Sequence, residues 1–204
     1  MPGRLFLTHS KSELAEHIGV AVPQSLVAGR NLAPGQNLTV WTGEDWRDMR
    51  WGIIPNGRVN ARGRPVMETI VNARSETVFD KSAFEGTSRA VVLASGWYEW
   101  TGEKRKKTVW EFSLKSGKPL IIAAITDTWS APGGQAIHQV ATLTCEPNAD
   151  VSPIHHRMGL FIEPSKVSKW LDGNTDVLPP LPDGLLRIRK LDAKEGREIT
   201  EGRG

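Results

Sequence analysis

The chain has 204 residues and a mass of 22.5 kDa, which suits one large domain or two very small ones, and we expect one. Hydrophobic residues make up 39% and charged residues 24%, so the chain can bury a substantial core, which excludes disorder of the whole chain. The 26 basic and 23 acidic residues give a net charge of +3, which favours anionic partners only mildly. The single cysteine, Cys145, excludes an internal disulfide and zinc patterns built on cysteines.

A short helix is predicted near the N-terminus, over residues 11–18. Ser10 and Glu13 have the spacing of a capping box, in which each side chain bonds to the backbone of the other residue. Gly19 follows the apolar positions of this segment and is a typical helix stop.

Most of the remaining chain has the apolar runs and turns of a β-rich protein. The predicted strands are residues 38–41, 49–54, 90–93, 97–100, 109–114, 120–125, 137–144 and 160–162. Residues 101–107 contain Gly and four cationic side chains, which suits the tip of a hairpin. We favour a solvated turn there over a phosphate contact.

A second helix is predicted between Pro164, a residue typical of a first helical turn, and Gly173, a typical stop. No linker or shift in composition divides the chain before Leu191. Strands outnumber helices and do not alternate with them, so we predict one α+β domain over residues 1–191 with mainly antiparallel sheets. The polar residues 192–204 are predicted to form a frayed tail.

No membrane span of about 18 apolar residues and no apolar signal-peptide segment is recognisable. We therefore expect a cytoplasmic protein with no membrane partner.

Arginines gather between residues 58 and 74, where Arg58, Arg62, Arg64 and Arg74 surround a single acid. Such a cluster indicates either a phosphate-contacting patch or a solvated loop, and the sequence favours neither.

Glu99 is the first candidate for acid–base chemistry. It stands between aromatic residues in the segment 95–100, where burial would raise the pKa of its carboxyl toward neutrality. The alternative is that Glu99 faces solvent on an alternating strand, with Trp97 on the same solvent-exposed face. The segment alone leaves both interpretations open.

His155 and His156 are further candidates for proton transfer near neutral pH, with Arg157 as an anion contact. Adjacent residues of an extended chain point in opposite directions, so we do not expect the two imidazoles to share a metal, and no metal or cofactor is predicted. Structural histidines bonded to the backbone are at least as common. Cys145 lies in an apolar run and is interpreted as an inert buried thiol.

Six segments, taken together and in order, resemble the SOS response-associated peptidase (SRAP) family of abasic-site processing proteins. The segments are residues 3–6, 31–34, 50–55, 71–77, 96–100 and 154–158. The resemblance covers about residues 1–172. It implies a barrel-like β fold flanked by helices, with a groove for single-stranded DNA that carries an abasic site, and we expect a monomer.

The resemblance also implies roles for individual residues. Asn72 would orient the adduct, Glu99 would assist ring opening and proton transfer, and His155 would be the partner acid or base. The implied DNA contacts are Arg4, Pro34, Arg74 and Arg157.

Position 2 departs from the family pattern. The resemblance implies a cysteine there, exposed by removal of Met1, whose amine and thiol close a thiazolidine on the abasic aldehyde. This chain has Pro2, so no thiazolidine can form. A terminal proline would still offer a secondary amine, which condenses with aldehydes to an iminium and permits β-elimination of the 3′ phosphate.

Three alternatives to this covalent chemistry remain at the level of sequence. The chain could bind abasic or single-stranded DNA without covalent chemistry, or Pro2 could be an engineered replacement of a cysteine. A peptidase acting on other proteins is the least supported, because no serine or cysteine nucleophile with a positioned base is evident.

Overall fold

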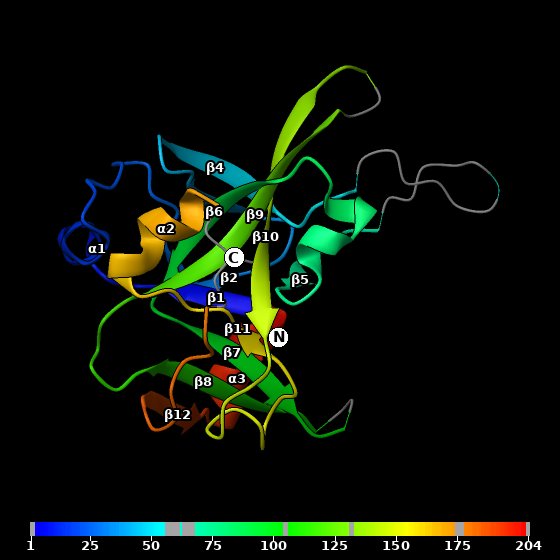
Figure 1. The fold of residues 1–204 in the computed structure, drawn as a ribbon. Helices are drawn as coiled ribbons and strands as arrows, with labels where there is room; N and C mark the ends of the chain where they lie inside the picture. Colours follow the sequence, from blue (N-terminus) through cyan, green and yellow to red (C-terminus); the bar gives the residue numbers. More distant parts are fainter. Residues whose placement is uncertain are drawn as a thin grey trace.

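The computed structural model describes residues 3–55, 62, 68–103, 106–130, 133–173 and 178–202. The strands are β1 Arg4–Leu7, β2 Gly29–Leu32, β3 Asn37–Trp41, β4 Trp46–Trp51, β5 Asn72–Arg74, β6 Ser88–Ala94, β7 Gly96–Thr101, β8 Thr108–Leu114, β9 Leu120–Ser130, β10 Ala136–Cys145, β11 Met158–Gly159 and β12 Leu186–Lys190 (Figure 1). The helices are α1 Lys11–Ile18, α2 Val167–Leu171 and α3 Ala193–Glu201, with short 3-10 turns at Val78–Asp80, Ser82–Phe84 and Pro164–Lys166. None of the helices in these ranges is long and apolar enough to cross a membrane.

Two sheets build the molecule. In the larger one β10 pairs with β4, β4 with β3, β3 with β6, β6 with β9, and β9 again with β10, so five strands close into a barrel. The other sheet has the order β12-β8-β7-β1-β2 and lies below the barrel in Figure 1. All pairings are antiparallel except those of β10 with β4 and β5. The predicted α+β class with mainly antiparallel, barrel-like sheets is confirmed.

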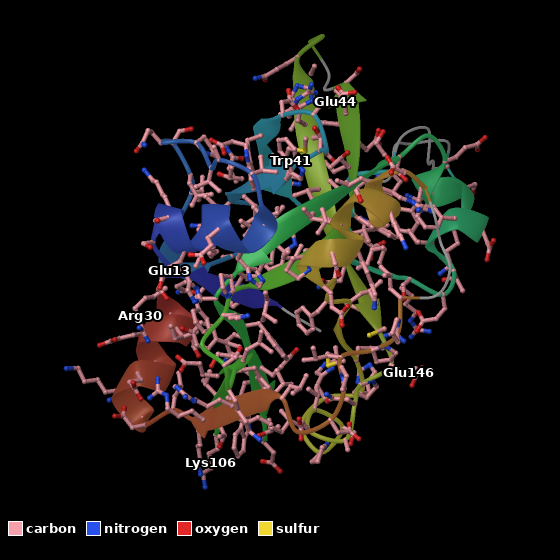
Figure 2. The ribbon with its side chains drawn as sticks, turned by 60° about the vertical axis from the view of Figure 1, so that its left-hand side comes forward. Glu13, Arg30, Trp41, Glu44, Lys106 and Glu146 are labelled. Carbon is pink, nitrogen blue, oxygen red and sulfur yellow. The ribbon has the colours of Figure 1, made fainter. Side chains whose placement is uncertain are left out.

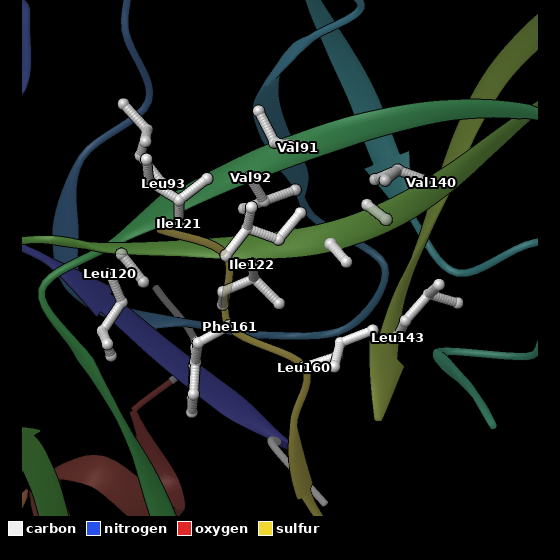
Figure 3. Packing of buried hydrophobic residues seen from close by; sticks show 14 of the residues in the cluster. Val91, Val92, Leu93, Leu120, Ile121, Ile122, Val140, Leu143, Leu160 and Phe161 are labelled. Atoms are coloured by element: carbon white, nitrogen blue, oxygen red, sulfur yellow. The ribbon is translucent and has the colours of Figure 1, made fainter. Parts of the chain in front are cut away.

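The hydrophobic core fills the barrel and the space between the two sheets. Side chains from β6, β9, β10 and the segment around Phe161 meet there (Figure 3). Trp97 of β7 reaches this core from the other sheet, with its ring centroid 4.7 Å from that of Phe112 and 5.1 Å from that of Phe161. Burial of large aromatic and aliphatic side chains at this junction joins the two sheets into one body.

A glycine at the start of β7 allows β1 to lie close beside it. A Cβ atom on Gly96 would collide with the backbone oxygen of Phe112 and with the ring of Phe6. The absence of a side chain therefore lets β1 pair with β7 in the register that sets Arg4 across from Tyr98.

The local helix signals of the sequence are confirmed. Ser10 and Glu13 form both bonds of the capping box at the start of α1, and Gly19 ends the helix at φ 76°. The second predicted helix is present as α2, entered through the 3-10 turn that starts at Pro164. The strand predicted at 160–162 is shorter and earlier, because only β11 has ladder pairing, while Phe161 makes a single bridge to β9.

The chain after Leu191 differs from the predicted tail. Residues 193–201 form α3, whose N-cap Asp192 makes a capping box with Glu195, a sequence signal equivalent to the one at α1. Ile199 buries its side chain against Phe6 and Tyr98. Helix α3 thus covers the outer face of the five-stranded sheet.

Replacement of Ile199 by alanine tests whether α3 is part of the folded unit. Because this side chain is 7% exposed, we expect Ile199→Ala to lower the free energy of unfolding by about 2 kcal/mol. Urea denaturation followed by tryptophan fluorescence measures the change. The matched control is Glu198→Ala, an exposed neighbour that should change stability by about 0.5 kcal/mol or less. Equal stabilities for the two variants would contradict the packing of α3.

Candidate active site

Glu99 lies on the face of β7 that points into the space between the sheets. Its exposed fraction is 4%, and Trp97, two residues earlier on the same face, is also buried. The solvent-facing alternative is therefore wrong. Burial raises the pKa of the Glu99 carboxyl from its ordinary value of 4.5 to about 7, and the positive charge of the amino terminus opposes this rise. The group can both donate and accept a proton near neutral pH.

The first residues of the chain approach Glu99 through the pairing of β1 with β7. Arg4 lies across from Tyr98 and Leu5 across from Trp97. Continuing this antiparallel register by one residue puts Gly3 across from Glu99. Pro2 lies outside the described residues, but it is bonded to Gly3.

Asn72 lies on β5, which pairs in parallel with the second half of β10. Thr142, its partner on β10, is fully buried and donates its hydroxyl hydrogen to Asn72 Oδ1 at 2.5 Å. This bond fixes the orientation of the amide, with Oδ1 toward Thr142. Sequence reasoning missed Thr142, because a threonine inside an apolar strand gives no signal of its own.

His155 is half-buried and lies in the turn that leads from β10 to β11. Its Nδ1 atom is 3.0 Å from the backbone nitrogen of Arg157, which donates to it, and 3.1 Å from the backbone oxygen of the same residue. The ring stacks on that of His156 with 4.4 Å between centroids, so the expectation that the two imidazoles point apart is wrong. The cause is that this segment is a turn and not an extended strand.

Burial lowers the pKa of His155, and the positive charge of the amino terminus adds to this effect. The pKa values of Glu99 and His155 therefore both respond to the same terminal charge, although Glu99 lies on β7 and His155 in the turn after β10. This shared response supports one site that contains the Glu99 carboxyl and the His155 imidazole.

Arg157 lies in an internal ion pair. Its side chain is 5% exposed, and its guanidinium binds both oxygens of Glu76 at 2.7 Å. A hydrogen bond from Arg157 lowers the pKa of Glu76, and the reverse interaction raises that of Arg157. A guanidinium engaged in this way is poorly placed to bind a DNA phosphate, in contrast to the role that the family resemblance implies. Glu76 lies in the segment 71–77 that contributes to the family resemblance, but its partner Arg157 lies 81 residues later in the chain.

The other predicted DNA contacts separate into two groups. Arg74 is exposed at the end of β5, and Pro34 is exposed in the turn before β3, which is held by a bond from Gly35 N to Trp51 O. Arg4 points to the opposite face of the five-stranded sheet, where it donates to Asn31 Oδ1 at 2.9 Å and to a backbone oxygen at the end of α3.

Arg4 is therefore not brought together with Glu99, whereas Arg74 follows Asn72 directly along β5. Of the remaining arginines in the sequence cluster, Arg62 is exposed, and Arg58 and Arg64 lie outside the described residues.

Across the described ranges, no group of three or more His, Cys, Asp and Glu side chains could hold a metal ion. Burial raises the pKa of Cys145 to about 11, in agreement with an inert thiol.

Comparisons with known proteins agree with this fold. The family model of the SOS response associated peptidases (SRAP) matches residues 1–194. The abasic site processing protein YoqW of Bacillus subtilis is 27% identical over 179 residues, which cover 83% of this chain and 78% of that protein. The abasic site processing protein HMCES of Gallus gallus is 30% identical over 149 residues, which cover 61% of this chain and 44% of that protein.

Solved structures are similar as well. A protein from Bordetella bronchiseptica has a TM-score of 0.77 at 20% identity, covering 93% of this chain and 99% of that one. A protein from Bacteroides thetaiotaomicron has a TM-score of 0.77 at 18% identity, covering 94% and 93%. At these identities the likeness concerns the fold alone.

The pKa of Glu99 predicts a pH dependence of stability. Between about pH 4.5 and about pH 7 the folded protein holds a proton on Glu99 that the unfolded chain has released, so stability falls as pH rises through this window. Relative to Glu99→Gln, the wild type should lose about 3 kcal/mol of unfolding free energy from about pH 4 to about pH 8. Urea denaturation of both proteins at the two pH values measures this. A difference that stays constant with pH would disprove the burial effect.

Proposed function

The chain belongs to the SOS response associated peptidase (SRAP) family, and on this premise we propose that it processes abasic sites in single-stranded DNA through the N-terminal amine of Pro2. Relatives that carry the name abasic site processing protein support the substrate class. The observation that carries the chemistry is the buried Glu99, whose pKa of about 7 suits proton transfer and which faces the start of the chain.

The reaction starts from the ring-opened form of the abasic sugar, which has an aldehyde at C1′. Removal of Met1 exposes the secondary amine of Pro2, and an α-amino group with a pKa of about 8 is neutral in roughly a tenth of molecules at pH 7. The neutral nitrogen attacks the aldehyde carbon, a proton moves to the oxygen, and loss of water leaves an iminium ion. The positive nitrogen acidifies C2′, and loss of that proton expels the 3′ phosphate by β-elimination.

Three side chains have roles in this proposal. Glu99 in its protonated form donates the proton to the departing water, and as a carboxylate it accepts one. His155 is the partner acid or base. The amide of Asn72, held by Thr142, donates a hydrogen bond to the sugar adduct.

The strand would be held by Arg74, which is exposed next to Asn72, while Pro34 contacts the bases. We do not assign Arg4 or Arg157 to phosphate binding, because both guanidinium groups already have internal partners. The reaction needs no cofactor or metal. We propose a cytoplasmic protein that acts as a monomer on DNA.

A non-covalent binder of abasic DNA is the second candidate, and it is favoured by the replacement of the family's cysteine by Pro2. Without a thiol a covalent adduct stays reversible, whereas a non-covalent binder forms no iminium at all. Borohydride separates them, because it reduces an iminium to a stable amine.

We predict that protein starting at Pro2, verified by mass spectrometry, is trapped by borohydride on an abasic single-stranded oligonucleotide. A denaturing gel should show the adduct only when reductant is present, together with a cleaved strand in its absence. Strong binding of abasic DNA with neither adduct nor cleavage would assign the chain to the non-covalent class.

The matched variants address the amine and the thiol separately. Protein that retains Met1 should give no adduct at proline, because the nitrogen of Pro2 is then an amide. The variant Pro2→Cys has both amine and thiol, so its adduct should survive denaturation without borohydride. An oligonucleotide without the abasic site controls for trapping that does not need the aldehyde.

A further inference from the structure

Three segments of the chain meet at the buried guanidinium of Arg157. Nη1 and Nη2 bind the two oxygens of Glu76, which follows β5, each at 2.7 Å. Nη2 also donates to the backbone oxygen of Thr144, near the end of β10, at 2.7 Å. The Arg157 side chain therefore ties the turn that carries it to both strands.

The two carboxylates near Arg157 contribute unequally. Glu76 makes a bidentate pair of short, charge-assisted bonds, the geometry that is strongest for arginine. Glu146 approaches Nη1 only to 3.4 Å, and its side chain is 79% exposed at the surface (Figure 2). A buried charge that loses its main partner is strongly destabilised, whereas an exposed pair contributes little. Glu76 is thus the partner that holds Arg157 in place.

The backbone of the same arginine is the partner of His155. Its N–H lies 3.0 Å from Nδ1, and where Nδ1 accepts this hydrogen bond the proton of the neutral ring is on Nε2. Its carbonyl oxygen, 3.1 Å from the same Nδ1, can accept the hydrogen that Nδ1 gains when the ring is protonated. The backbone of a single residue, Arg157, therefore offers a partner to both protonation states without a large movement of the ring.

We infer that Glu76 and Arg157 are positioning residues for His155. The ion pair fixes the backbone of Arg157, the backbone fixes Nδ1 as an acceptor, and the proton of the neutral imidazole is presented at Nε2. This inference rests on the proposed function only for the use of that proton. The tautomer itself is a property of the protein without DNA.

Nitrogen-15 NMR of the imidazoles in the DNA-free protein tests the positioning directly. Above the pKa of His155, the wild type should show an unprotonated Nδ1 and a protonated Nε2, with the resonances assigned by comparison with His155→Gln. The isosteric variant Glu76→Gln should shift part of the population to the Nδ1-protonated tautomer. Glu146→Gln, which alters the exposed carboxylate beside the same arginine, should leave the tautomer unchanged.

A wild-type ring that carries its proton on Nδ1 would overturn the inference, whatever the variants do. So would a folded Glu76→Gln protein with the tautomer of the wild type. In the trapping assay, Glu76→Gln should lower the rate of adduct formation about tenfold and change the affinity for the abasic strand less than twofold. If no protein forms an adduct, the proposed chemistry fails, while the tautomer measurement still decides the positioning role.

Discussion

The pairing of β1 with β7 is the constraint on which the candidate site depends. Three residue pairs fix the register, and Gly96 makes the close approach possible because it has no side chain to collide with Phe6. This register carries the start of the chain to the buried carboxyl of Glu99. In the proposed function, this pairing is what makes Glu99, from a strand more than ninety residues away in sequence, the proton-transfer partner of the terminal amine.

Strand β10 organises the other half of the site. One of its edges pairs with β9 and closes the barrel, and the other edge pairs first with β4 and then with β5. Asn72 and Arg74 of β5, and Glu76 just after it, thereby lie along the end of β10. The turn that follows β10 contains His155 and Arg157. The barrel thus supplies the amide, the imidazole and the ion pair of the candidate site, and the second sheet supplies the carboxyl.

Sequence reasoning succeeded where the signal is local. The capping box at Ser10, the turn residues and the apolar runs identified two helices and most strands, because these elements are decided by neighbours a few residues apart. Helix α3 was missed although Asp192 and Glu195 have the same spacing, because its stability depends on packing against Phe6 and Tyr98.

The roles of the arginines could not be predicted in the same way. Arg4 binds the end of α3, which lies 198 residues later, and Arg157 binds Glu76, which lies 81 residues earlier. A basic residue in a family motif indicates a DNA contact until such a distant partner is known. The burial of Glu99 also needed the structure, since the alternation of β7 is equally compatible with a solvent-exposed face until the barrel is placed against it.

The nitrogen of Pro2 is the reacting atom of the proposed chemistry. Peptide mapping of the borohydride-reduced adduct by mass spectrometry locates the added sugar directly. The added mass is expected on the N-terminal peptide, at Pro2. An added mass on a lysine, or on Cys145, would contradict it.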